Sequence, residues 1–97
     1  MSDAAKEQAM KKFREIPGVG KVISRDLWDL GMRSFEDIAK SNPEKMYKDL
    51  CMLRQMYIDR CMLYVLRTAV YYASHVRHDP RLLQWWNWTD ERRGQGT

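Results

Sequence analysis

The distribution of glycine restricts the fold of this sequence more than any other feature. The five glycines lie at positions 18, 20, 31, 94 and 96, and none occurs between Met32 and Arg93. A sandwich or barrel of short strands needs glycine in its tight turns, so this long stretch without glycine argues against such folds. Leucine and methionine also outnumber valine and isoleucine. We therefore predict an all-α protein.

Length and charge limit what such a chain can do. Its 97 residues provide material for one domain with a modest core, too little for a two-lobed enzyme. We expect a single domain over residues 1–90 and a flexible polar tail over residues 91–97. The net charge of +4 permits a polyanionic partner without requiring one. Two cysteines, no secretory leader and no long apolar run predict a cytoplasmic protein without membrane contact.

Apolar residues recur at helical spacing through most of the chain, which predicts a compact domain of five or six helices. The expected helices span residues 3–16, 21–30, 34–40 and 58–77, with another beginning at Pro43 and a short last one after Asp79-Pro80. The helix over residues 58–77 is apolar on most sides, so we expect neighbours to surround it. We expect Leu53 and Val76 on buried helix faces.

One short segment carries recognisable chemistry. Ile16-Pro17-Gly18-Val19-Gly20-Lys21 joins the first two expected helices, and the small residue Ser24 follows at helical spacing. This pattern resembles a helix-hairpin-helix motif. Glycine permits a positive φ and lets another group approach the backbone closely. The helix that follows offers unpaired N–H groups and a dipole that favours an anion.

The segment predicts a site that binds the phosphate backbone of nucleic acid, in which main-chain N–H groups of residues 18–20 hold a phosphate. The predicted contact residues are Gly18, Val19, Gly20, Lys21 and Arg25. Two cations of the first helix are expected to add auxiliary charge: Lys11 and Arg14. The Val19 side chain is expected to pack between the two helices. The residues leave open a second interpretation, in which the turn is purely structural.

A broader resemblance runs from about Met10 to Asp90. Beyond the hairpin, it rests on Asp26-Leu27-Trp28-Asp29-Leu30-Gly31, Asp59-Arg60-Cys61 with Leu63-Tyr64, Ala69-Val70-Tyr71 and Trp85-Trp86-Asn87-Trp88. The chain resembles the small bacterial "pathogenicity locus" family of helix-hairpin-helix proteins, some of which carry mitomycin-resistance labels. It is also similar to the C-terminal domain of TfoX-type competence regulators. The resemblance implies a compact, SAM-like helical domain with tandem hairpins.

A faint internal repeat agrees with two stacked hairpins. A shift of 37 residues aligns apolar positions of two helix–turn–helix segments. The second copy reads Arg54-Gln55-Met56-Tyr57 where the first carries its glycines, so we expect a degenerate second hairpin. Whether residues 54–57 contact phosphate stays open, and any two amphipathic helix pairs could align this well.

Three other groups of residues are better explained by structure than by function. Arg60, Tyr64, Arg67 and Tyr71 alternate along one helix face, as on a single-strand binding surface. We favour a half-buried face with arginine stems over tyrosine rings. The tryptophans after Pro80 are expected to close the core. The cysteines and histidines lack the spacing of a zinc site, and no metal or cofactor is predicted.

The sequence thus predicts a DNA-binding module without sequence specificity and without catalysis of its own. Binding should be weak and sensitive to salt, because one intact hairpin neutralises few phosphates. The alternative is a protein–protein interaction module in which the hairpin is only structural. Its aromatic C-terminal segment or its arginine–tyrosine face would then bind a partner protein or a second copy.

Overall fold

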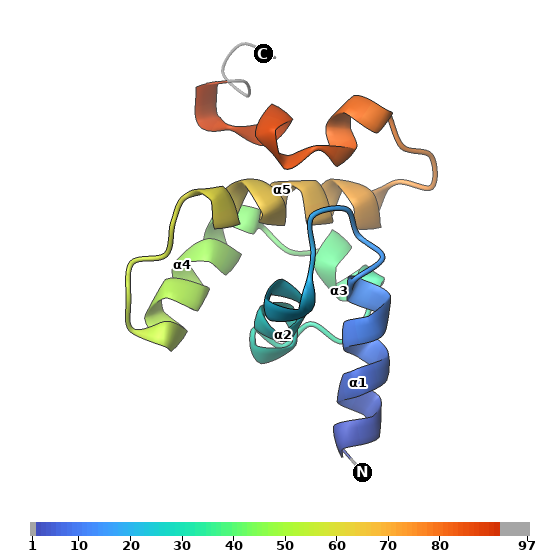
Figure 1. Ribbon diagram of the computed structural model, residues 1–97, viewed down its shortest axis with the longest axis vertical. Coiled ribbons are helices and arrows are strands. Elements are labelled where there is room, and N and C mark those ends of the chain that lie inside the picture. The colour runs from blue at the N-terminus through green and yellow to red at the C-terminus, as the bar shows by residue number, and fades with distance from the viewer. Residues whose placement is uncertain (1, 92–97) are drawn as a thin grey trace.

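The computed structural model describes residues 2–91, which form five α-helices, two 3-10 helices and no strand (Figure 1). The α-helices are α1 (Ser2–Phe13), α2 (Lys21–Asp29), α3 (Phe35–Ala39), α4 (Pro43–Arg54) and α5 (Cys61–Ser74), and the 3-10 helices are η1 (Pro80–Leu83) and η2 (Trp85–Trp88). The predicted all-α fold is confirmed. No helix in the described part is long and apolar enough to span a bilayer. Apart from Glu91, the predicted tail lies outside the described residues.

Helix α5 lies at the centre of the molecule. Helices α3 and α4 pack against it on one side, and η1 and η2 lie along the other (Figure 1). Its buried residues are Met62, Leu63, Val65, Leu66, Arg67, Thr68 and Ala69. A helix surrounded by its neighbours is therefore confirmed. Two predicted core residues are exposed instead: Val76 follows the end of α5 and is 97% exposed, and Leu53 at the end of α4 is 49% exposed.

Two helices are shorter than predicted for local reasons. Helix α1 ends at Phe13, because the hydrogen bonds of residues 15 and 16 span three positions instead of the four of an α-helix. The chain then tightens, and the Ile16 N–H donates to the Phe13 carbonyl at 3.0 Å. Helix α5 begins at Cys61, whose N–H donates to the Asp59 carboxylate at 2.8 Å. This backbone hydrogen bond holds the pKa of Asp59 below its usual value.

The connection between α1 and α2 is a tight turn at Ile16-Pro17-Gly18-Val19. The Val19 N–H donates to the Ile16 carbonyl at 3.0 Å, and Gly18 has a φ of +88°. Proline at the second position and a positive-φ glycine at the third are features of a type II turn. Ile16 and Val19 are buried in the core together with Phe13 of α1. The predicted inward packing of Val19 is confirmed, and the turn fixes α1 against α2.

A buried guanidinium holds the C-terminal segment across α5. Arg67 is 5% exposed, and its Nη1 donates to the Trp88 carbonyl at 2.7 Å. Its Nη2 donates to the carboxylates of Glu44 at 2.8 Å and Asp90 at 2.9 Å. Arg60 also pairs with Asp90, at 2.6 Å. A buried charge is tolerated when its hydrogen bonds are satisfied, and here its partners come from α4 and from the segment around and after η2.

The face that carries alternating arginine and tyrosine residues is used inside the fold. The Arg67 guanidinium lies 5.6 Å from the centre of the Tyr64 ring, and the Tyr64 ring stacks on Trp85 at 6.4 Å. The Tyr71 hydroxyl accepts a hydrogen bond from the Asp79 N–H at 2.8 Å. The structural interpretation of this face, with arginine over tyrosine, is confirmed.

Replacing Gly18 by alanine should destabilise the protein by about 1–2 kcal/mol, because the φ of +88° is unfavourable for a residue with a Cβ. Gly20→Ala is the matched control. Gly20 has a φ of −99°, and no atom beyond Gly20 and its two chain neighbours lies within 4 Å of the position of an added Cβ. The free energy of unfolding of Gly20→Ala should differ from that of the native chain by less than about 0.5 kcal/mol. The weaker N-cap destabilises the folded state, and the lower flexibility of the unfolded chain offsets this loss. Urea unfolding monitored by circular dichroism measures both. Equal losses would contradict the assigned turn.

The protein should lose stability in acid through Asp90. Its ion pairs, first with Arg60 and then with Arg67, hold the pKa of this carboxyl well below its usual value. A depressed pKa adds stability above the pKa of about 3.9 of an unfolded aspartate, and this stability disappears as the pH falls toward the folded value. Asp90→Asn should therefore be less stable than the native chain at pH 7, and the difference should shrink below pH 4. A difference that is independent of pH in urea unfolding would contradict this.

Candidate functional site

The N-terminus of α2 is open, whereas each of the three α-helices that follow it has a side-chain acceptor for an N–H of its first turn. Ser34 caps α3 and Asn42 caps α4, and Asp59 accepts the first N–H of α5. Helix α2 has Gly20 at its N-cap and no side-chain cap. In the described chain, no acceptor is bonded to the N–H groups of residues 20–22. Such orphan donors and the helix dipole favour an anion at this end.

The predicted set of three turn N–H groups is wrong at one position. The Val19 N–H donates to the Ile16 carbonyl, because this bond closes the type II turn. Within the described residues, the N–H groups of Gly18 and Gly20 have no acceptor. The continuous run of open donors therefore begins at Gly20 and extends into the first turn of α2. The bonded Val19 N–H separates the Gly18 N–H from this run.

The two turn glycines differ in what the fold requires of them. Gly18 needs to be glycine because its φ is positive. Gly20 has an extended backbone that any residue adopts, and the space where its Cβ would lie is empty to a distance of 4 Å. Neither the conformation of Gly20 nor its surroundings in the described chain call for the absence of a side chain. The backbone at Gly20 is thus accessible to a group from outside.

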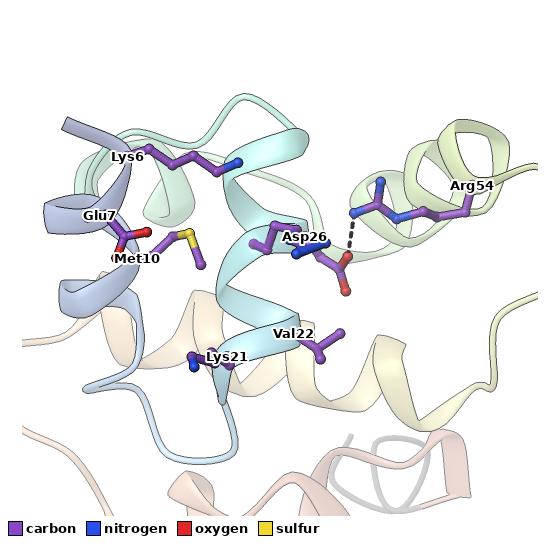
Figure 2. A pocket seen from close by; sticks show the side chains of 8 residues that line it. Lys6, Glu7, Met10, Lys21, Val22, Asp26 and Arg54 are labelled. Atoms are coloured by element: carbon purple, nitrogen blue, oxygen red, sulfur yellow. Dashed lines mark hydrogen bonds and ion pairs between the residues drawn. The ribbon is translucent and has the colours of Figure 1, made fainter. Parts of the chain in front are cut away.

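A groove beside this helix end gathers positive charge from three helices. Lys21 and Arg25 line it from α2, Lys6 lines it from α1, and Arg54 lines it from α4 (Figure 2). Lys21 and Arg25 were both predicted, and the fold places them in one groove. Lys6 and Arg54 were not predicted. Lys6 lies one turn before Met10 on α1, but only the packing of α1 on α2 shows that this face borders the groove.

Arg54 has its charge neutralised within the fold. Its Nη2 lies 2.6 Å from a carboxylate oxygen of Asp26 and 2.7 Å from one of Asp29 (Figure 2 shows the first pair). These hydrogen bonds raise the pKa of the guanidinium above its already high value. The pairs join α4 to α2 and offset one of the two negative charges that Asp26 and Asp29 carry. In the region that was expected to form a degenerate second hairpin, Arg54 thus binds carboxylates of the chain itself.

The remaining predicted residues lie away from the groove. Lys11 on α1 and Arg14 after it are both exposed, and neither lines the groove.

Trp85 packs against the core and the Trp88 indole donates to the Leu82 carbonyl at 2.8 Å, while Trp86 is 51% exposed. Across residues 2–91, no three histidine, cysteine, aspartate or glutamate side chains gather in a way that could hold a metal ion.

Comparison with known proteins places the chain in a family. A segment of 31 residues, 32% of the chain, is 52% identical to part of the ATP-dependent DNA helicase Hel308 of Thermoplasma acidophilum, and it covers 5% of that protein. No solved structure matches the chain. The model of the "Pathogenicity locus" family matches residues 6–94. This match covers nearly the whole chain and includes the turn, the groove and the C-terminal tryptophans, and the chain therefore belongs to the Pathogenicity locus family.

Proposed function

We propose that this protein binds DNA through the phosphate backbone, without sequence specificity and without catalysis of its own. The observation that carries the proposal is the open N-terminus of α2, where the N–H groups of residues 20–22 lack acceptors in the described chain. A phosphate oxygen placed there would accept hydrogen bonds from main-chain groups that would otherwise be bonded only to water. Contacts of this kind fix the position of a backbone and do not distinguish bases.

The environment of Gly20 supports the same proposal. A phosphate can approach the main chain closely only where no Cβ intervenes. Gly20 provides such a place, although the fold does not demand a glycine there. Lys21 and Arg25 then supply charge from the first turns of the same helix, and neither forms an ion pair within the described residues. The helix-hairpin-helix pattern of residues 16–24 is interpreted accordingly as a phosphate-binding turn.

Two further observations agree with binding alone. The residues that line the groove beside the turn include no histidine, cysteine or serine, and the Asp26 carboxylate among them is held in an ion pair with Arg54 at 2.6 Å. The partial match to a DNA helicase connects about a third of the chain to a protein that is named for acting on DNA. The cytoplasmic location expected from the cysteines fits such a partner, and it too stays a proposal.

The proposal predicts that Gly20→Ala weakens DNA binding and leaves stability nearly unchanged. The added methyl group would lie where the phosphate approaches, in space that the protein itself leaves empty. Gly20→Asp and Lys21→Glu should abolish detectable binding at low salt, because each places a carboxylate at the anion site. Gel shift on short duplexes at low salt measures the loss. Lys48→Glu, on the exposed side of α4, is the charge-matched control for Lys21→Glu.

Circular dichroism must show that all these variants are folded. If two phosphates are neutralised, log affinity should fall against log salt with a slope of about −2. A native chain that shows no shift at low salt would contradict DNA binding. Equal binding by the native chain and Lys21→Glu would contradict the assigned site, and the turn would then be only structural.

A second candidate function, association with another copy of the chain, is supported by one exposed apolar surface. The surfaces first expected for a protein partner are largely used within the fold, since Trp85 and the arginine–tyrosine face pack internally. Apolar side chains are instead exposed at the end of α4 and just after it: Met52 73%, Leu53 49%, Met56 60% and Tyr57 81%. Monomeric proteins rarely leave such side chains clustered in water.

If this surface mediates association, Met56→Lys should weaken self-association at least about tenfold. The loss follows because burying one methionine contributes roughly 1.5–3 kcal/mol and about 1.4 kcal/mol is a factor of ten. Sedimentation velocity over a concentration series measures it. Val76→Lys is the control, because Val76 is 97% exposed and lies after the far end of α5. A native chain that stays monomeric at every concentration would exclude this second function.

A further inference from the structure

The groove between α1 and α2 is larger than one phosphate contact at the turn requires. Its volume is about 450 Å³, and it extends from the N-terminus of α2 to the first half of α1. Figure 2 shows Lys21 at the turn end, while the Lys6 side chain reaches from α1 toward α2 at the opposite end. Met10 lies between them and is 7% exposed, so it forms an apolar floor. Val22, which is 74% exposed, lines the groove from the other side of α2, toward α4 (Figure 2).

The charges along the groove favour an anionic occupant. Lys6, Lys21 and Arg25 form no ion pair within the described residues. Asp26 lines the same groove, but its carboxylate is paired with Arg54 at 2.6 Å. Glu7 is the remaining carboxylate of the lining, and the three lysine and arginine side chains outweigh it. Arg54 thus acts on the groove indirectly, by neutralising a carboxylate that would repel an anion.

The arrangement along the groove is cation, apolar surface, cation. An isolated phosphate at the turn would leave Lys6 and the Met10 floor unused. A nucleic-acid strand, by contrast, repeats a phosphate, a less polar sugar and another phosphate. We propose that the groove is a second phosphate subsite, in which Lys6 and Arg25 hold the phosphate next to the one at the α2 N-terminus. The sugar between the two phosphates lies over Met10.

This inference rests on the proposed function and names its ligand more closely, as a continuous strand with at least two consecutive phosphates in the site. It also specifies the path of the strand on the protein. From the turn, the strand runs along the groove between α1 and α2, and it does not cross α5. In this proposal, Lys6 supplies the auxiliary positive charge that was predicted for Lys11 and Arg14. Lys11 and Arg14 do not line the groove.

The test compares the salt dependence of DNA binding by the native chain, Lys6→Ala and Lys12→Ala. Lys12 is the matched control, because it lies on the same helix but borders a different cavity, next to Phe35. Fluorescence anisotropy with a short fluorescein-labelled duplex, from about 50 to 200 mM salt, gives the slope of log affinity against log salt. Lys6→Ala should reduce the magnitude of the slope by about 0.9, the value expected for one phosphate. Its affinity at low salt should fall several-fold, and Lys12→Ala should match the native chain.

Each outcome separates this inference from the proposed function. If Lys21→Glu abolishes binding but Lys6→Ala has the slope of the native chain, the second subsite is wrong and binding at the turn stands. If Lys6→Ala and Lys12→Ala reduce the slope equally, the effect is one of general charge and the subsite is again overturned. If the native chain does not bind the duplex, the proposed function fails and this inference fails with it.

Discussion

The buried guanidinium of Arg67 is the constraint on which the arrangement of the helices depends. It lies on the central helix α5 at 5% exposure, so its charge must find partners inside the protein. Glu44 of α4 provides one, and the Trp88 carbonyl and Asp90 of the C-terminal segment provide the others. The C-terminal segment consequently folds back along α5 (Figure 1).

The position of the C-terminal segment in turn supports the α1–α2 turn. Trp85 stacks on Tyr64 of α5, and its ring lies 3.8 Å from where a Cβ of Gly18 would be. Val65 of α5 lies at the same distance from this position. The turn therefore rests on α5 and on η2 through its Gly18 side, while Gly20 faces empty space. Packing of one side of the turn leaves the other side open, and this is the side that the proposed function uses.

The charge of the groove depends on which side chains the fold brings together there, and it does not follow from the net charge of the chain. The net charge of +4 is modest for 97 residues. Arg54 is 25 and 28 residues away from its two partners in sequence, and it pairs with both Asp29 and Asp26 of α2. Positive charge therefore predominates in the groove, although α2 itself carries both signs. Membership of the Pathogenicity locus family describes the chain without naming a reaction or a ligand, so the functional argument rests on this local geometry.

Much of the candidate site could be predicted from the sequence because its signals are local. Proline followed by glycine specifies the turn, Gly20 and Lys21 mark the start of α2, and Arg25 follows one helical turn later. The main error, the Val19 N–H, arose because every N–H of the turn was counted as free, although the residue after Pro-Gly in a type II turn donates the hydrogen bond that closes the turn. Leu53 and Val76 were expected to be buried because helical spacing alone does not show where a helix loses its neighbours.

By itself the sequence determined the all-α fold, the approximate helices and the proline–glycine turn between α1 and α2, because propensity, capping and turn chemistry act over a few residues. Only the tertiary structure decided that Lys6 lies across a groove from Lys21, that Arg54 pairs with Asp26 and Asp29 of α2 and that Arg67 orders the C-terminal segment. These contacts join residues far apart in the chain. Their geometry depends on how whole helices pack, and no short stretch of sequence encodes it.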